Sequence, residues 1–328
     1  MVVAVTALAM IGASCGGDDD PDATAPAVTT EQPTTTTTTE LPAPETTEAT
    51  TTELPVPETT EAAGELPVEV AMVGDVAYTS ERMLDVYAPT EGAGWPVVVY
   101  FHGGLPAPGS RSEDAALLQA VAAQGLVVYA PDWRSSGPVG GSQDSVCAIA
   151  YAEATAADHG GDPDAVTVSG YSTGGFTALV HGLLGPDAPL EVTDCEVDPD
   201  IALPDAIAVG GTPVFAAEWA RDGLLPLPAW TSITPEELDL FDPYLLLGRN
   251  PDAIVALAVG ENDQGGPGAP PGGWPITDAN LDYHQRLIDA GYNATLTTFP
   301  GGHVIAAGSE QEAAFADMIV DAATSAAG

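Results

Sequence analysis

The chain has 328 residues and a strongly unbalanced charge, because 48 aspartate and glutamate residues stand against only six basic ones and leave a net charge of −42. All six basic residues are arginine, so the chain offers no extended basic surface to phosphate groups. This composition argues against nucleic acid as a partner and against adsorption of the folded body to an anionic membrane.

Residues 1–14 form an apolar stretch that ends directly before Cys15. The stretch is too short to span a bilayer. It resembles the signal peptide of a bacterial lipoprotein, in which Cys15 would carry the lipid and the lipid would be the only membrane contact. Two features depart from this pattern: the stretch has no basic residue, which a secretion signal normally carries, and Gly12 stands where a larger aliphatic residue is usual. An ordinary secretory signal peptide is the alternative. Both interpretations predict an exported protein, either lipid-anchored at the cell surface or secreted.

Residues 16–65 are rich in threonine, proline and glutamate, and residues 51–63 nearly repeat residues 38–50. Few apolar side chains are present to offset the entropy of ordering, so the composition predicts a disordered linker. The remaining residues, 66–328, are long enough for one α/β domain with a large core.

The segment 66–328 alternates between strand-like and helix-like stretches. Alternating apolar residues at 68–72 and 84–87 predict an antiparallel edge hairpin, and later continuous apolar runs predict strands buried on both faces. These strands are expected at 97–101, 126–129, 166–168, 206–209 and 254–259, with a last strand at 292–299. Helices are expected at 113–123, 145–158, 175–184, 278–290 and 310–323. The order predicts an α/β fold with a mostly parallel sheet, helices on both faces, and a ligand site at the carboxyl ends of the strands.

The central motif is G-x-S-x-G, formed by Gly170, Tyr171, Ser172, Thr173 and Gly174 between a predicted strand and a predicted helix. A sharp turn in this setting exposes a nucleophilic serine above the sheet edge. The two glycines leave room where strand and helix crowd together, and the helix N-terminus supplies free N–H groups for a developing negative charge.

With these flanks the chain resembles the α/β-hydrolases, in particular the small bacterial carboxylesterases related to hormone-sensitive lipase and to feruloyl esterases. The resemblance covers residues 66–324. It implies a central, mostly parallel sheet with helices on both faces and a small cap insertion. It also implies a serine hydrolase that needs no cofactor and no metal.

His102, Gly103 and Gly104 follow directly on a predicted buried strand and resemble the oxyanion-loop motif of this family, with Leu105 in place of a third glycine. We expect the N–H groups of Gly104 and Thr173 to hold the oxyanion, with Gly103 or Leu105 as a further donor. His102 is expected to hold the loop by hydrogen bonding rather than to act as the base.

The catalytic acid and base are expected after the last two strands. Asp263 follows the strand at 254–259 at the family's spacing, and Glu261 is the alternative acid. His303 follows the last strand and completes the chain order Ser, Asp, His of this fold. The remaining histidines are expected in packing or surface positions, and they are His159, His181 and His284.

An aromatic and proline-rich interval at 212–247 interrupts the strand–helix rhythm and predicts a cap over the site. Within it Trp219 is a candidate for substrate contact. Two further candidates are Trp274, in a glycine- and proline-rich loop after the expected acid, and Tyr171, beside the expected nucleophile.

Cys147 and Cys195 are the two cysteines other than Cys15, and neither has metal-ligand spacing. In an exported protein such a pair predicts a disulfide. The resulting hypothesis is an exported serine esterase that acts on a small-molecule ester through Ser172, His303 and Asp263. Alternatives are a peptidase or acyltransferase on the same residues, or an inactive, surface-tethered binding module.

Overall fold

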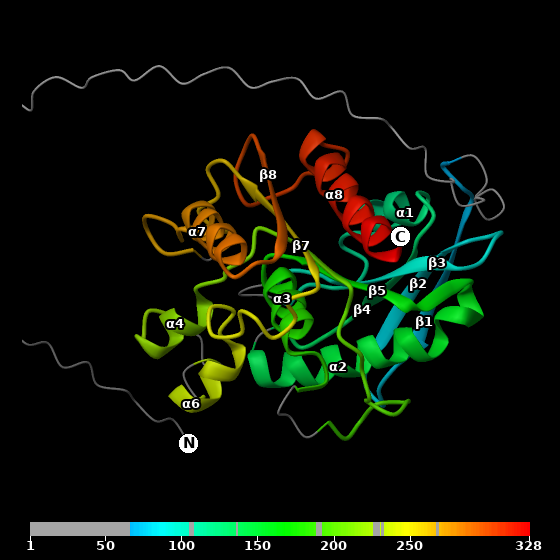
Figure 1. Ribbon diagram of the computed structural model, residues 1–328, viewed down its shortest axis with the longest axis horizontal. Helices are drawn as coiled ribbons and strands as arrows, with labels where there is room; N and C mark the ends of the chain where they lie inside the picture. The colour runs from blue at the N-terminus through cyan, green and yellow to red at the C-terminus, as the bar shows by residue number, and fades with distance from the viewer. Residues whose placement is uncertain are drawn as a thin grey trace, which may run out of the picture. The chain divides into compact units, whose positions relative to one another are not determined.

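The structure is a computed structural model that describes residues 66–104, 108–135, 137–187, 192–225, 230, 233–266 and 269–328. The predicted signal peptide with Cys15, the predicted linker at 16–65 and Leu105 lie outside the described residues. The described part forms an eight-stranded sheet in the order β1-β2-β4-β3-β5-β6-β7-β8 (Figure 1). The strands are β1 (Val70–Ala77), β2 (Met83–Pro89), β3 (Trp95–Phe101), β4 (Val127–Pro131), β5 (Gly161–Tyr171), β6 (Ala206–Gly210), β7 (Ile254–Gly260) and β8 (Asn293–Phe299).

The sheet is antiparallel at one edge and parallel elsewhere. β1 pairs with β2 as the predicted hairpin, and β2 pairs antiparallel with β4. From β4 through β3, β5, β6 and β7 to β8, every neighbouring pair is parallel. In the pairing of β3 with β5, Phe101 lies opposite Gly170, so the carboxyl ends of these two strands meet beside the serine turn.

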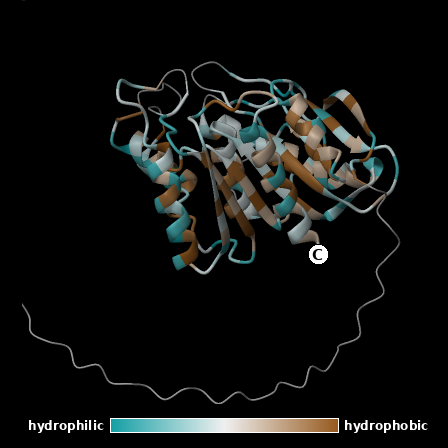
Figure 2. Cartoon of the chain, turned by 90° about the horizontal axis from the view of Figure 1, so that it is seen from above, coloured by the Kyte–Doolittle hydropathy of each residue, from teal (hydrophilic) through white to brown (hydrophobic). Residues whose placement is uncertain are grey.

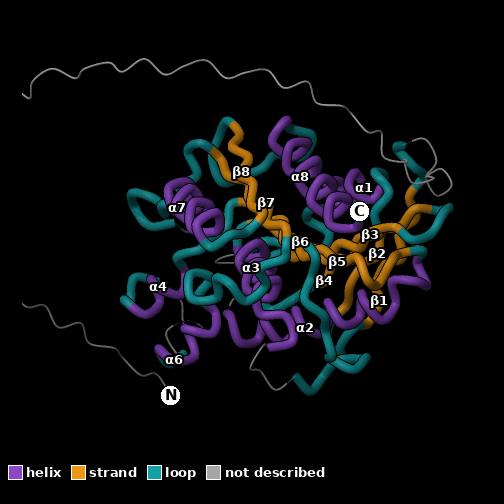
Figure 3. Tube along the Cα trace, viewed as in Figure 1, coloured by secondary structure: helices purple, strands orange, loops and turns teal. Residues whose placement is uncertain are grey.

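Helices cover both faces of the sheet, as predicted (Figure 3). They are α1 (Ala115–Ala122), α2 (Pro138–Thr155), α3 (Thr173–Leu184), α4 (Ala216–Arg221), α6 (Pro235–Leu238), α7 (Ile276–Asp289) and α8 (Glu310–Ala327). Single-turn 3-10 helices occur at Ala156–His159, Gly185–Asp187 and Asp239–Phe241. Among the described residues, none of the helices has the length and apolar character needed to cross a membrane.

The period of two along a strand divides the core into two layers. On β3, Val97, Val99 and Phe101 pack with α2 and α3, whereas Val98 and Tyr100 pack on the opposite face with α1 and α8. Both sets are fully buried, which explains the continuous apolar runs in the sequence. Figure 2 shows the apolar residues concentrated on the central strands.

Two elements begin at least five residues earlier than the sequence pattern indicates. α2 starts at Pro138 rather than at residue 145, and β5 starts at Gly161 rather than at residue 166. The early part of α2 contains two glycines, which hide its helical character, although a proline in the first turn favours a helix start. β5 is longer because Gly161 pairs with Trp95 of β3, a tertiary contact that the local sequence does not encode.

A disulfide joins Cys147 in α2 to Cys195, as predicted, with a sequence separation of 48. Cys195 also forms an isolated antiparallel bridge with Thr79, directly after β1. The disulfide therefore links the segment around Cys195, which has little regular secondary structure, to α2. It also brings that segment against the end of the edge strand.

Replacing both Cys147 and Cys195 by alanine should lower the free energy of unfolding by at most about 4 kcal/mol, the chain-entropy value for a loop of this length. Denaturant unfolding of the variant and of the parent, with and without reductant, measures the change. The reduced parent should match the variant. Two free thiols in the non-reduced parent would contradict the disulfide.

Glu153 of α2 gives a pH-dependent contribution to stability. Burial raises the pKa of its carboxyl from 4.5 to about 7, although the N–H of Ala202 donates to Oε1 at 3.2 Å and opposes the rise. Because the folded state binds the proton more tightly than the unfolded state, stability is lost as the pH rises from about 4.5 to about 7.

Glu153→Gln should therefore raise the melting temperature relative to the parent, by an amount that grows between about pH 4.5 and pH 7 and is constant above that range. Glutamine keeps an acceptor for the Ala202 N–H and removes the charge. Thermal unfolding of both proteins over this pH series provides the measurement. A difference that does not vary with pH would contradict the assignment.

Candidate active site

Ser172 occupies a strained turn between β5, which ends at Tyr171, and α3, which begins at Thr173. Its backbone has φ 58° and ψ −122°, in the positive-φ region that a residue with a side chain rarely adopts. Two backbone hydrogen bonds hold it there: its N–H donates to the Gly210 carbonyl at 2.8 Å, and its carbonyl accepts from the Phe176 N–H at 3.0 Å.

The glycines of the motif allow α3 to approach the end of β3, as the sequence indicated. A Cβ on Gly174 would fall on the Phe101 carbonyl oxygen, and one on Gly170 would lie 2.5 Å from the Gly174 carbonyl carbon. Both contacts involve backbone atoms, which cannot turn aside. At Gly175 a Cβ would lie 2.4 Å from the Thr212 side-chain oxygen and 3.1 Å from the nearest backbone atoms. The turn at Ser172 therefore requires glycine at 170 and 174.

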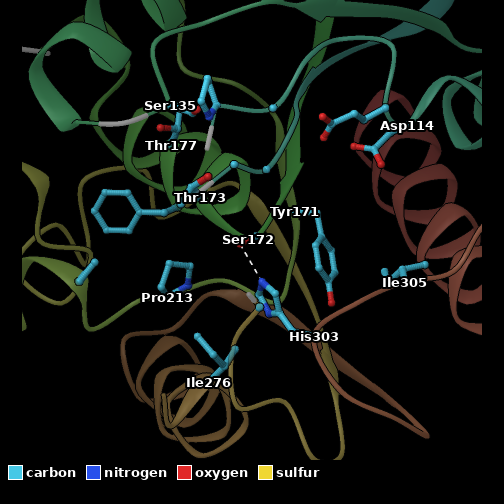
Figure 4. Close-up of a pocket in the computed structure, with 18 of the residues that line it drawn as sticks. Asp114, Ser135, Tyr171, Ser172, Thr173, Thr177, Pro213, Ile276, His303 and Ile305 are labelled. Atoms are coloured by element: carbon cyan, nitrogen blue, oxygen red, sulfur yellow. Dashed lines mark hydrogen bonds between the residues drawn. The ribbon is translucent and has the colours of Figure 1, made fainter. Parts of the chain in front are cut away.

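The structure brings Ser172, His303 and Asp263 together from three separate loops. His303 Nε2 lies 2.8 Å from Ser172 Oγ (dashed in Figure 4), and His303 Nδ1 lies 2.9 Å and 3.0 Å from the two carboxylate oxygens of Asp263. The Asp263 side chain is fully buried and that of His303 is 11% exposed. With Nδ1–H donating to the carboxylate, Nε2 is free to accept from the serine hydroxyl.

Asp263 is held at the end of β7 by contacts that the sequence analysis did not identify. Its backbone N–H donates to Thr277 Oγ1 at 2.8 Å, and the Thr277 hydroxyl donates to the Gly260 carbonyl at 2.7 Å. The N–H of Gly265 donates to Asp263 Oδ1 at 2.9 Å. The alternative acid, Glu261, is exposed and has no contact with His303 among the described residues. Thr277 lies in the first turn of α7, and no sequence motif marks it.

The expected oxyanion loop lies against Ser172. A Cβ on Gly103 would stand 3.3 Å from Ser172 Cβ, and Gly104 has φ 155°, a conformation that favours glycine. Thr173 is the first residue of α3, so its N–H has no partner within the helix. Gly103 and the N-terminus of α3 thus both lie beside Ser172.

His102 is buried beneath this loop, and in the described part of the chain its ring forms no hydrogen bond with Ser172, Asp263 or His303. Its Nδ1 lies 2.7 Å from the Gly103 carbonyl, to which Nδ1–H donates, and Trp133 Nε1 donates to the His102 carbonyl at 3.2 Å. Burial lowers the pKa of His102, which keeps the ring neutral. The arrangement agrees with the expected structural role.

The three other histidines lie away from Ser172. His181 is buried in α3, where its Nε2 lies 2.8 Å from Ser142 Oγ and burial lowers its pKa to about 4. His159 ends a 3-10 helix and packs edge-on against Tyr129. His284 lies on α7, with Nε2 3.4 Å from the Ala294 carbonyl. All three occupy the packing positions expected from the sequence.

A cavity of about 440 Å³ opens at Ser172 and His303, at the carboxyl ends of the strands. Its lining is mainly apolar, but two sides differ in chemistry (Figure 4). We call the first side the hydroxyl arm, and its residues are Ser135, Thr173, Phe176, Thr177 and Trp230. We call the second side the acidic arm, and its residues are Glu113, Asp114, Tyr171, Ile305 and Glu312.

The acidic arm contains a carboxyl group whose ionisation is disfavoured. Burial raises the pKa of Asp114, and the Tyr100 hydroxyl, which donates to Asp114 Oδ2 at 2.9 Å, opposes that rise. Glu113 and Glu312 add to the negative potential around Asp114. A substrate group with a negative charge would be repelled from this arm.

Two of the three residues expected to contact substrate line this cavity, namely Tyr171 and Trp274. Trp219 does not belong to the lining, and we correct that expectation. Its ring packs on Phe215 with centroids 4.5 Å apart, and Phe215 itself lines the cavity. The described part of the predicted cap interval contributes Pro213, Phe215, Ala216, Leu225 and Trp230 to the wall.

The sheet order, the strand–serine–helix turn and the three converging loops define the α/β-hydrolase fold, and the chain adopts that fold. Esterase B from Lactobacillus rhamnosis has a similar structure, with a TM-score of 0.63 and 18% identity over 80% of this chain and 89% of that one. A bacterial heroin esterase is also similar, with a TM-score of 0.59 and 20% identity over 80% of this chain and 85% of that one.

Sequence comparison points to the same group of proteins. A family model described as BD-FAE matches residues 84–201. Carboxylesterase NlhH of Mycobacterium tuberculosis is 28% identical over 260 residues, which cover 72% of this chain and 74% of that protein. The chain thus has the α/β-hydrolase fold, and its sequence is similar to that of a bacterial carboxylesterase.

Thr277→Val should slow covalent labelling of Ser172 by a fluorophosphonate about 10- to 100-fold. The Asp263 N–H and the Gly260 carbonyl then lose the bridging hydroxyl and keep only their direct hydrogen bond of 3.2 Å, so the carboxylate shifts. Thr277→Ser retains the hydroxyl and is the matched control, expected within about threefold of the parent. Labelling reactions that are quenched at successive times and analysed by mass spectrometry give both rates. Equal rates in the valine variant and the parent would show that Thr277 does not position Asp263.

Proposed function

We propose that the protein is a serine hydrolase that cleaves carboxylic esters through an acyl-enzyme. The observation that carries the proposal is the line of contacts from Ser172 Oγ to His303 Nε2, 2.8 Å, and from His303 Nδ1 to Asp263, 2.9 Å. It is supported by the similarity to proteins named as esterases, both in sequence and in fold.

In this mechanism Ser172 Oγ attacks the ester carbonyl carbon while its proton passes to His303 Nε2. The oxygen of the tetrahedral intermediate accepts hydrogen bonds from the N–H groups of Gly104 and Thr173, with Gly103 as a further donor. Asp263 stabilises the imidazolium and keeps its orientation. The intermediate collapses when His303 gives the proton to the leaving alcohol.

A water molecule completes the cycle. His303 takes a proton from this water, the resulting nucleophile attacks the acyl carbonyl, and the acid leaves as Ser172 recovers its proton. The same residues would serve a peptidase or an acyltransferase, because the triad does not select the leaving group or the acceptor. Ester hydrolysis is the proposal because the similar proteins are named as esterases.

We also propose that the protein works outside the cytoplasm. The disulfide between Cys147 and Cys195 suits an oxidising compartment. Lipid attachment at Cys15 and an extended acidic linker at 16–65 would hold the catalytic domain away from a membrane surface. Cys15→Ala tests the anchor, because it should release the protein from the detergent phase or block its processing.

Ser172→Ala and His303→Ala should each lower kcat/KM for a short-chain ester by about 10⁴-fold or more, and Asp263→Asn by a similar order, since the three side chains act as one unit. Circular dichroism of each variant should match the parent. Steady-state hydrolysis of 4-nitrophenyl esters provides the measurement.

Glu261→Gln is the matched control for Asp263→Asn, because it removes a neighbouring, exposed carboxylate from the same turn. It should leave hydrolysis within about threefold of the parent. A severe loss in Glu261→Gln with normal turnover in Asp263→Asn would move the acid to Glu261. If a fluorophosphonate failed to label Ser172 at all, the inactive binding module would replace the esterase.

A further inference from the structure

Three polar groups in the wall of the hydroxyl arm have no hydrogen-bond partner within the described part of the chain. They are Ser135 Oγ, Thr173 Oγ1 and Trp230 Nε1. Each belongs to a residue that is more than nine-tenths buried, with 5%, 8% and 5% of its surface exposed. Buried polar groups are nearly always paired, so three unpaired ones in the wall of one cavity indicate that something else binds them.

The placement of these groups is compact. Thr173 and Thr177 lie one turn apart on α3, and Figure 4 shows both beside Ser135, on the opposite side of Ser172 from Tyr171 and Ile305. Trp230 reaches the same wall by packing edge-on against Phe176, with centroids 5.4 Å apart. The result is an apolar wall that carries hydroxyl and indole N–H groups.

The position of His303 decides which part of an ester enters this arm. In the proposed reaction the leaving alcohol takes its proton from His303, so the alcohol must lie on the His303 side of Ser172. Figure 4 places His303 on the opposite side of Ser172 from Ser135 and Thr173. The acyl group, which remains bound to Ser172, is therefore directed into the hydroxyl arm.

We propose that this arm binds an acyl chain that carries a hydrogen-bonding oxygen, as a hydroxyl, keto or ether group, and selects it over a purely alkyl chain. The inference rests on the proposed ester hydrolysis and adds the substrate class. Indole N–H is only a donor, whereas serine and threonine hydroxyls both donate and accept. An acyl oxygen has two lone pairs and can accept from two of these groups, and the aromatic walls accommodate the carbon skeleton.

The test compares ethyl alkanoates with counterparts in which one acyl methylene, beyond the carbon next to the carbonyl, is replaced by an ether oxygen. Each enzymatic kcat/KM is divided by the hydroxide-catalysed rate, which removes differences in intrinsic reactivity. For at least one oxygen position the parent protein should prefer the ether ester by about tenfold or more, because the alkyl ester leaves buried polar groups unpaired.

Ser135→Ala and Trp230→Phe should each reduce this preference at least about threefold, because the ether ester loses a hydrogen-bonding partner that the alkyl ester does not use. Ser80→Ala is the matched control: Ser80 is exposed, and its hydroxyl donates to Asp194 at 2.8 Å. It should retain the full preference.

Each other outcome overturns a specific part of the proposal. Equal kcat/KM for ether and alkyl esters, with turnover that depends on Ser172, would refute the oxygen preference while ester hydrolysis stands. A preference that survives in both variants would refute the assignment to these groups. A preference found only when the oxygen is in the alcohol would reverse the orientation. Absence of both ester hydrolysis and fluorophosphonate labelling would refute the proposed function itself.

Discussion

The close packing of α3 against the carboxyl ends of β3 and β5 is the constraint on which the site depends. It forces Ser172 into a positive-φ conformation and leaves space only for glycine at 170 and 174, where any side chain would strike backbone atoms. As a result, the Ser172 hydroxyl lies beyond the edge of the sheet, next to the unpaired N–H groups at the N-terminus of α3. The buried parallel strands supply the rigidity that keeps this strained turn in place.

Two of the arginines hold the loops around that turn in place through ion pairs. Arg111, in the connection after the oxyanion loop, contacts Asp75, Asp85 and Asp132 at the same time. Arg134, directly before Ser135, pairs with Asp144 at 2.7 Å. In a chain with so large an acidic excess, each of these cations neutralises carboxylates that would otherwise repel one another, and both stand next to residues that line the cavity.

The two arms of the cavity differ in the substrate groups that they favour. The acidic arm, with Glu113, Asp114 and Glu312, disfavours an anionic group, whereas the hydroxyl arm presents unpaired donors on an apolar wall. In the proposed ester hydrolysis, the side of Ser172 on which His303 lies directs the acyl group into the hydroxyl arm. We therefore attribute selectivity to the cavity walls, and reactivity to Ser172, His303 and Asp263.

The sequence by itself determined the order of strands and helices, because apolar runs and glycine-rich turns are local signals. It also predicted Ser172, Asp263 and His303 as the site residues, because each follows a predicted strand in an order that resembles the α/β-hydrolases, although Glu261 stayed open as the acid. The disulfide was predicted as well, from two cysteines in a chain that is expected to be exported. Only the tertiary structure decided that Thr277 holds Asp263 in place. It also decided that Trp219 packs on Phe215 and does not line the cavity. Finally, it decided that Ser135 and Trp230 line the same cavity as residues of α3. These contacts join residues far apart in the chain, and no local periodicity or motif records which surfaces will meet when the sheet and its helices pack.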